Sequence, residues 1–149
     1  MIEGENMTKT ELLQYWFDEV WTKGNLDVIY QMLSPEAKAN GLFPTFGLNT
    51  VDYHDLALAI RHLVKDIKIG FSHTLEQGDW LAARTVVNAK RADNDAPINL
   101  TGQVFVRFED RKMVEVFSHY NFLSLFEQLG QIPTDVLPIC LTGQRLQWA

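Results

Sequence analysis

Cysteine, long apolar runs and clustered positive charge are all scarce in this sequence, and each shortage excludes a class of protein. The only cysteine, Cys140, cannot form an intrachain disulfide, and its neighbours do not suggest a metal site or a nucleophile. No stretch approaches the roughly 18 apolar residues that are needed to span a membrane. The first six residues carry acidic side chains where a signal peptide carries basic ones. We therefore expect a cytoplasmic protein in a reducing compartment.

The charge balance and the missing motifs exclude further functions. A net charge of −6, with no dense group of Lys and Arg, argues against binding to a phosphate backbone. The sequence has no Gly-rich phosphate loop, no Gly-x-Ser-x-Gly nucleophile elbow and no Cys/His pair. His54 and His62 are eight positions apart, which places them roughly 80° apart around a helix. We expect no nucleic-acid partner, no cofactor and no metal.

Length and composition indicate a single domain over residues 1–149. The sequence is 46% hydrophobic and 21% charged, which is ordinary for a soluble globular protein, and it contains no internal repeat. We expect a core over about residues 8–130, followed by an apolar, proline-marked tail over residues 131–149 that covers its own core or a partner subunit. The apolar and proline residues of this tail are Ile132, Pro133, Val136, Leu137, Pro138, Ile139, Leu141 and Trp148.

Helical signals dominate the first 64 residues. Thr8 and Glu11 have the spacing of a capping box, and Gly24 is a plausible helix stop. A second, shorter helix can begin at Asn25, and Thr50 or Asp52 could cap a third helix. The apolar stripe of the first helix has helical period and should pack into the core; it consists of Leu12, Leu13, Trp16, Phe17, Val20 and Trp21.

From Ile67 the apolar period changes to two, which is typical of half-buried strands. Short turns separate four such segments and predict an antiparallel meander, and a short amphipathic helix should follow. The predicted strands cover residues 67–75, 80–90, 98–108 and 113–121. Helices on one face of an antiparallel sheet make an α+β domain, here a cone-shaped curved sheet wrapped around the N-terminal helices with an apolar mouth suited to a small ligand.

Four motifs, in this order, carry a family resemblance. They are Phe17 to Asp27 with its Gly-Asn-Leu-Asp ending, Glu76 to Arg84, Phe105 to Glu115, and Leu123 to Gly130 with its closing Gln-Leu-Gly. Together they resemble the SnoaL-like polyketide cyclase family of the nuclear-transport-factor-2-like superfold. The resemblance implies a cone that binds an aromatic polyketide and closes a ring by an intramolecular aldol reaction.

The resemblance also implies a general acid/base, an aspartate seven positions before the Gln of Gln-Leu-Gly. Counting back from Gln128 reaches Asn121 instead. An amide cannot take a proton near neutral pH, although it can donate a hydrogen bond to an enolate oxygen. On a regular strand Phe117, His119 and Asn121 share one face, which the family's orientation makes the cone wall. His119 would then be the nearest group with a suitable pKa; the alternative is an inert, hydrogen-bonded histidine.

Three other side chains are candidates for contact with a ligand. His73 alternates with Phe71 and Ile69, so it should face inward, either as a buried histidine or as part of a pocket wall. Tyr15 and Tyr30 on the first two helices could offer phenols to the cone, as in ketosteroid isomerases of the same superfold, or could lie at the edge of the core.

The sequence therefore predicts a SnoaL-like pocket protein for an apolar or aromatic carbonyl compound. If it is an enzyme, we expect a cofactor-independent cyclase, isomerase, hydrolase or lyase in which Asn121 polarises a carbonyl and His119 moves the proton. The alternative is a non-catalytic ligand-binding or oligomeric interaction module of the same fold. In either case we expect a homodimer that buries sheet and tail surfaces.

Overall fold

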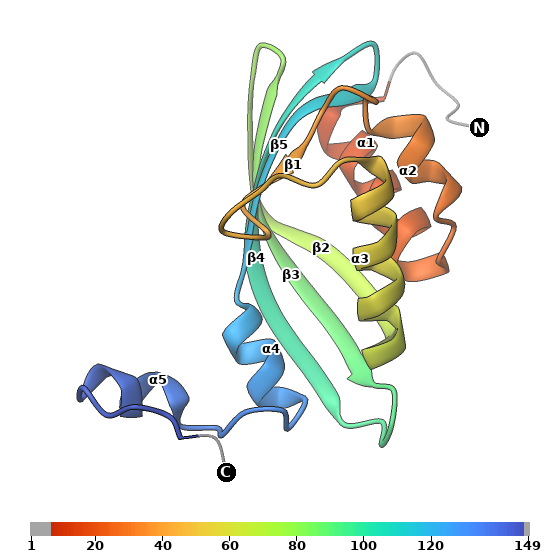
Figure 1. Ribbon diagram of the computed structural model, residues 1–149. Coiled ribbons are helices and arrows are strands. Elements are labelled where there is room, and N and C mark those ends of the chain that lie inside the picture. The colour runs from red at the N-terminus through yellow and green to blue at the C-terminus, as the bar shows by residue number, and fades with distance from the viewer. Residues whose placement is uncertain (1–6, 148–149) are drawn as a thin grey trace.

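Three helical segments lie against one face of a curved, open five-stranded sheet (Figure 1). The computed structural model describes residues 7–147, so the acidic start of the chain and Trp148 lie outside the described residues. The helices are α1 (Lys9–Trp16), the π-helix η1 (Phe17–Lys23), α2 (Asp27–Met32), α3 (Thr50–Leu63), α4 (Phe122–Gln128) and α5 (Val136–Leu141). The strands are β1 (Ala39–Asn40), β2 (Val64–Gln77), β3 (Trp80–Arg91), β4 (Pro97–Glu109) and β5 (Lys112–Tyr120). The predicted α+β architecture is confirmed.

The first helix begins and ends where the sequence indicates. The Thr8 hydroxyl accepts a hydrogen bond from the Glu11 amide at 3.1 Å, and the Glu11 carboxylate accepts one from the Thr8 amide at 3.1 Å. Gly24, with φ of +76°, ends the helical segment. The second half of this helical segment is a π-helix, which the apolar stripe in the sequence does not indicate. Residues i and i+5 of an α-helix lie roughly 140° apart, and the wider π turn brings Trp16 and Trp21 onto one buried side.

Two of the expected helix caps are wrong by one or more residues. The helix α2 follows Leu26 and has no side-chain cap, so Asn25 does not serve this role. Asn49, rather than Thr50 or Asp52, caps α3: its side chain accepts a hydrogen bond from the Asp52 amide at 2.8 Å. Asp52 completes the capping box from the third helical position, where its carboxylate accepts from the Asn49 amide at 3.3 Å.

The strands β2 to β5 form the predicted antiparallel meander, and β1 pairs with β5 in parallel, giving the order β1-β5-β4-β3-β2. Alternate side chains of β3 and β4 face the helices and form much of the core. These buried residues are Leu81, Ala83, Thr85, Val87 and Ala89 on β3, and Ile98, Val104, Val106 and Phe108 on β4.

A β-bulge in β2 reverses the side on which its second half points. Phe71 pairs with Thr85 and His73 pairs with Arg84, so Ser72 is an extra residue in the ladder. Before the bulge, odd-numbered residues such as Phe71 face the helices. After the bulge, the even-numbered residues do. The inward position predicted for His73 is therefore wrong. Its ring is exposed on the outer face of the sheet and lies 3.0 Å from the Ser72 hydroxyl.

The tail after α4 is only partly covered by its own chain. Val136 is buried, but Leu137 and Leu141 on α5 are exposed at 54% and 79%. Figure 1 shows α5 standing away from the sheet, beyond α4. Of the helices in the described part of the chain, none is long and apolar enough to span a membrane.

The short helix α4 begins directly after Asn121, whose side chain accepts a hydrogen bond from the Ser124 amide at 3.1 Å. Replacing Asn121 with Ala should lower the free energy of unfolding by about 1 kcal/mol because this amide loses its cap. Asn121→Asp should keep the stability, because a carboxylate is also a good cap. Urea unfolding followed by circular dichroism measures both effects. The control is Asn88→Ala, an exposed amide without a hydrogen bond to the described residues; an equal loss there would contradict the capping role.

Candidate functional site

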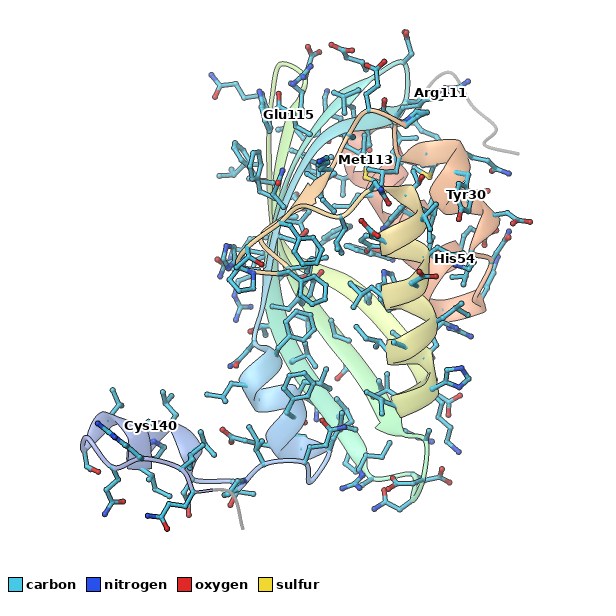
Figure 2. The ribbon with its side chains drawn as sticks, viewed as in Figure 1. Tyr30, His54, Arg111, Met113, Glu115 and Cys140 are labelled. Carbon is cyan, nitrogen blue, oxygen red and sulfur yellow. The ribbon has the colours of Figure 1, made fainter. Side chains whose placement is uncertain are left out.

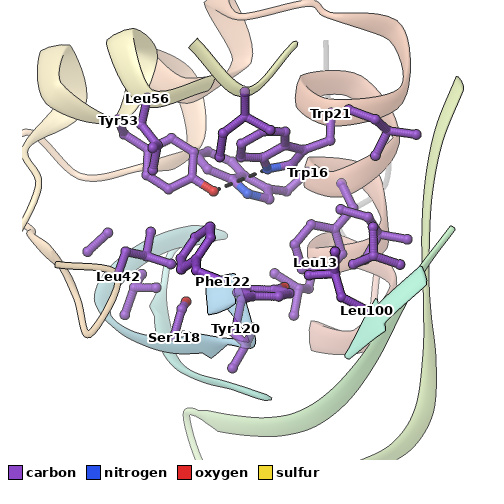
Figure 3. A pocket seen from close by; sticks show the side chains of 18 of the residues that line it. Leu13, Trp16, Trp21, Leu42, Tyr53, Leu56, Leu100, Ser118, Tyr120 and Phe122 are labelled. Atoms are coloured by element: carbon purple, nitrogen blue, oxygen red, sulfur yellow. Dashed lines mark hydrogen bonds between the residues drawn. The ribbon is translucent and has the colours of Figure 1, made fainter. Parts of the chain in front are cut away.

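A cavity of about 90 Å³ lies between the helices and the inner face of the sheet (Figure 3). Its walls come from α1, η1 and α3 on one side and from β2 to β5 on the other, with Leu42 and Phe122 at its edge. Most of its lining is aliphatic. The aromatic and polar side chains that reach it are Trp16, Phe17, Trp21, Tyr53, Ser118, Tyr120 and Phe122.

Among residues 7–147, no Asp, Glu, His, Lys or Arg lines this cavity. Its polar atoms are the hydroxyls of Tyr53, Tyr120 and Ser118 and the indole N–H groups of Trp16 and Trp21. The cavity can therefore bind a neutral apolar compound and offer it a few hydrogen bonds. It contains no group that could take up a proton near neutral pH. In residues 7–147, no group of three or more His, Cys, Asp or Glu side chains is placed to hold a metal.

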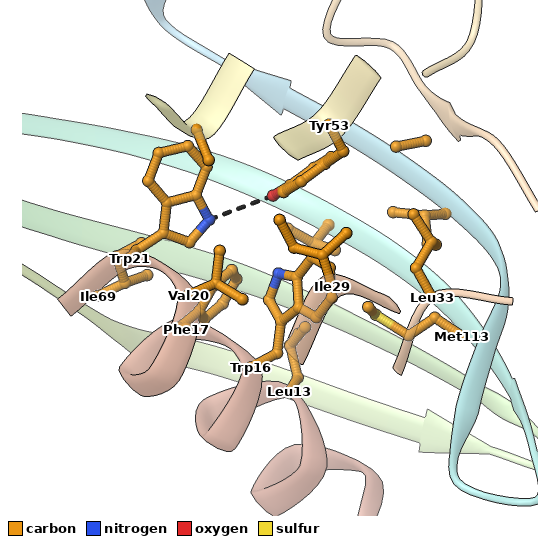
Figure 4. Close-up of a cluster of buried hydrophobic side chains, with 14 of the residues drawn as sticks. Leu13, Trp16, Phe17, Val20, Trp21, Ile29, Leu33, Tyr53, Ile69 and Met113 are labelled. Atoms are coloured by element: carbon orange, nitrogen blue, oxygen red, sulfur yellow. Dashed lines mark hydrogen bonds between the residues drawn. The ribbon is translucent and has the colours of Figure 1, made fainter. Parts of the chain in front are cut away.

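Tyr53 extends from α3 into the aromatic part of the wall (Figures 3 and 4). Its ring centroid lies 5.2 Å from that of Trp16 and 6.1 Å from that of Trp21. The Trp21 indole N–H donates a hydrogen bond to the Tyr53 oxygen at 3.2 Å. Burial raises the pKa of Tyr53 to about 12, and the hydrogen bond from Trp21 offsets only part of that rise. Tyr53 is therefore a neutral phenol at physiological pH.

Tyr120 on β5 lies across the ladder from Gly102 on β4, and the absence of a side chain there makes room for its ring. A Cβ atom at Gly102 would lie only 2.4 Å from the Tyr120 ring. The Thr85 and Tyr120 hydroxyls form a hydrogen bond at 3.2 Å. Burial raises the pKa of Tyr120 well above its ordinary value, so this phenol is also neutral.

The face predicted to line the cone is the wrong face of β5. Val116, Ser118 and Tyr120 point into the cavity, whereas Phe117 and His119 point to the opposite side of the sheet. Asn121 follows the strand as the exposed cap of α4 and does not line the cavity either. Successive strand residues point to opposite faces, so an error of one position moves the whole set. Whether Asn121 or His119 takes part in a reaction stays a prediction.

The outer face of the sheet brings three of the predicted residues together. His73, Phe117 and His119 line a shallow groove of about 330 Å³ over strands β2 to β5. Phe105 and Arg84 contribute to the same groove. These residues share a surface, but the sheet itself separates them from the cavity on its inner face.

Neither tyrosine proposed from the first two helices reaches the cavity. Tyr15 is half-buried and packs against the edge of the core. Tyr30 is 46% exposed, and its ring lies 6.0 Å from that of His54 on the outside of the helical layer (Figure 2). The phenols that do line the cavity are Tyr53 and Tyr120. Tyr53 shares a helical spacing with Leu56 and Ile60, and this apolar stripe is the sequence signal for its position.

The raised pKa of Tyr53 predicts a change in stability at alkaline pH. Between pH of about 10 and about 12 the unfolded chain releases this proton and the folded protein keeps it, so stability falls as pH rises. We expect Tyr53 to contribute up to roughly 1.4 kcal/mol per pH unit to this fall, and Tyr53→Phe to remove that contribution. Urea unfolding at a series of pH values measures the slope. The control Tyr30→Phe removes an exposed phenol outside the cavity; the same slope in Tyr53→Phe and the unmodified protein would contradict the assignment.

Comparison with solved structures supports the same architecture. A proposed polyketide cyclase of Acidithiobacillus ferrooxidans aligns with a TM-score of 0.71 and 16% identity, over 87% of this chain and 99% of that one. A proposed polyketide cyclase of Bacillus cereus aligns with a TM-score of 0.71 and 21% identity, over 87% and 89%. A Catenulispora acidiphila protein with a ketosteroid isomerase-like fold, in complex with trimethylamine, gives 0.69 and 12%, over 86% and 98%. At these identities the likeness establishes the fold alone.

Comparison at the level of sequence gives a family. The chain has no significant match among curated proteins. The family model described as SnoaL-like polyketide cyclase matches residues 11–129, which include the helices and strands that form the cavity. The chain therefore belongs to the SnoaL-like polyketide cyclase family.

Proposed function

We propose that this chain binds a small, neutral, apolar or aromatic carbonyl compound in the cavity beneath its helices. The observation that carries the proposal is the chemistry of the lining, which is apolar apart from hydroxyls and indole N–H groups. Pockets of this kind take up ligands through apolar contact and orient them through a few polar groups. An ionised ligand would be buried here without an opposite charge, which is strongly unfavourable.

The volume of the cavity restricts the size of the compound. About 90 Å³ is well below the roughly 300–1,000 Å³ of pockets for drug-sized ligands. It is closer to the roughly 150 Å³ of an apolar cavity that takes up benzene. A ligand with one ring therefore needs only small side-chain adjustments, whereas a polycyclic polyketide requires the wall to open.

The lining favours binding over turnover. The family's carboxylate is replaced by Asn121, which caps α4 outside the cavity. His119, the substitute base predicted from the sequence, points to the other face of the sheet. A cyclase or isomerase needs a group that removes a proton, so our primary proposal is a ligand-binding protein. A cofactor-independent enzyme is the second candidate, and the hydroxyls that could polarise a carbonyl support it.

A substitution that fills the cavity tests the pocket. Val87→Phe on β3 adds a ring to the lining and should weaken binding of acetophenone, a one-ring neutral ketone, at least about 10-fold. Isothermal titration calorimetry measures the affinity, and shifts of the Trp16 and Trp21 indole resonances in NMR spectra report where the probe binds.

The matched control is Val86→Phe, the same change one residue away on the opposite face of the same strand. It should leave the affinity unchanged. Equal weakening by both variants, at equal thermal stability, would contradict binding in the cavity.

We also propose that the outer face of the sheet forms a homodimer interface with a second copy of this chain. Leu75, Ala82, Phe105 and Phe117 are neighbours across four strands and form one continuous row. We call it the outer row. Leu75 is 77% exposed, and the two phenylalanines are exposed as well. An exposed apolar patch of this kind is typical of an interaction surface.

The residues beside the outer row support self-association. Trp80 stacks on Phe105 with ring centroids 4.5 Å apart. Arg107 pairs with Glu115 and Glu109, each at 2.8 Å, so its positive charge is compensated within one chain. A second copy approaching about a two-fold axis would meet the same apolar row.

Charges placed in the outer row test the dimer. The double variant Leu75→Asp, Phe117→Asp should raise the dissociation constant of the dimer by at least about 100-fold, because buried carboxylates would face each other. Analytical ultracentrifugation over a range of concentrations measures it. Leu58→Asp is the control, because Leu58 is exposed on α3, on the other side of the molecule. Deletion of residues 131–149 tests the tail separately. A monomeric unmodified protein would refute the interface.

The proposed location is the cytoplasm. Cys140 is an exposed free thiol, and a reducing compartment keeps such a group from oxidative pairing. Fractionation of the native host with an antibody against the chain tests this placement.

A further inference from the structure

One hydroxyl of the cavity has a defined hydrogen-bond role. The indole N–H of Trp21 can only donate, so the Tyr53 oxygen must accept in the 3.2 Å contact between them. The phenol therefore keeps its own O–H for a different partner. Among the described residues, the structure shows no hydrogen bond in which the Tyr53 hydroxyl donates. A buried donor without an acceptor costs roughly 1–3 kcal/mol, so this position favours an acceptor supplied from the cavity.

The other hydroxyls are less clearly assigned. Tyr120 and Thr85 both carry an O–H group, so either of them can be the donor in their 3.2 Å contact. Tyr53 differs because its partner is an indole. The direction of the Trp21–Tyr53 hydrogen bond is fixed because an indole can only donate. The direction of the Thr85–Tyr120 hydrogen bond depends on how the two hydroxyls rotate.

The Tyr53 hydroxyl is also held in place from two sides. Its ring packs against Trp16 and Trp21, which the π-helix brings to the same side. Arg61, two turns further along α3, donates a hydrogen bond to the backbone carbonyl of Trp21. The helix that carries the phenol and the helix that carries its indole donor are therefore joined at a second point. A fixed donor is what orients a ligand with little loss of entropy.

The required acceptor must be neutral. No cationic side chain lines the cavity to compensate a carboxylate or a phosphate. The remaining lining is apolar, so it provides contact area but does not orient a ligand. A carbonyl oxygen on an apolar ring is a neutral acceptor, and the ring suits the apolar lining.

We propose that the Tyr53 hydroxyl donates a hydrogen bond to the carbonyl oxygen of the ligand, with Trp21 as the residue that positions it. This inference rests on the proposed binding function and assigns its polar contact. The pocket then distinguishes a ketone from a hydrocarbon of the same shape.

The test uses two probes of nearly equal shape, acetophenone and α-methylstyrene, in which a C=CH₂ group replaces the carbonyl. We expect the protein to bind acetophenone about 5- to 10-fold more tightly, which matches the net value of one hydrogen bond. Tyr53→Phe should abolish this preference and leave α-methylstyrene affinity unchanged. Trp21→Phe should reduce the preference, and Tyr30→Phe, which removes an exposed phenol outside the cavity, should keep it. Calorimetry gives the affinities.

The infrared carbonyl stretch of bound acetophenone is the second measurement, and it needs no variant. A hydrogen bond from Tyr53 should move the band below its position in a hydrocarbon solvent, and Tyr53→Phe should move it back. A band at the hydrocarbon position in the unmodified protein would overturn the inference even if Tyr53→Phe does not fold.

The outcomes separate the two proposals. Equal affinity for both probes, or a preference that Tyr120→Phe abolishes and Tyr53→Phe does not, would overturn the role of Tyr53 and leave the pocket intact. Binding of neither probe would overturn the pocket and this inference with it.

Discussion

The alternation of side chains along the strands is the constraint on which the core, the cavity and the outer face all depend. On β3 and β4 every second residue is buried under the helices, and the residues between them point outward. The same rule places Tyr120 in the cavity and His119 outside it. Because the period is two, a single position decides which chemistry a residue can reach. On β5 the imidazole of His119 has the other parity, so Ser118 and Tyr120 reach the cavity and His119 does not.

The fold could be predicted because its signals are local. Periods, turns, the capping box of Thr8 and Gly24 each act within a few residues. The orientation of the family predicts which face of β5 lines the cavity, and this prediction is wrong. A better signal was present in the strand itself. In residues 115–120, Glu115 and His119 belong to one parity, while the other parity contains only Val116, Ser118 and Tyr120, and a buried face avoids charged residues.

Two features had no comparable signal. The bulge at Ser72 inserts one residue into a regular pattern, and nothing around it in the sequence distinguishes a bulge from a continuous strand. The π-helix likewise has no signal in the sequence, because the apolar stripe through Trp16 and Trp21 is typical of an ordinary amphipathic helix. Both depend on how elements pack against each other. The bulge removed His73 from the interior, and the π-helix gathered the indoles around Tyr53.

The resemblance predicts a carboxylate where this chain has Asn121, and in the structure Asn121 serves as a helix cap outside the cavity. Asn121 stands at the start of α4 and accepts a hydrogen bond from the Ser124 amide. A carboxylate at that position would be stabilised in its charged form by the helix N-terminus, which lowers its pKa and makes it a weaker base. The cavity is left with neutral hydroxyls, which can donate to a carbonyl oxygen but cannot remove a proton near neutral pH. If the cavity binds a carbonyl compound, as proposed, catalysis would additionally require a base within reach of the ligand, whereas the same apolar walls would serve for binding.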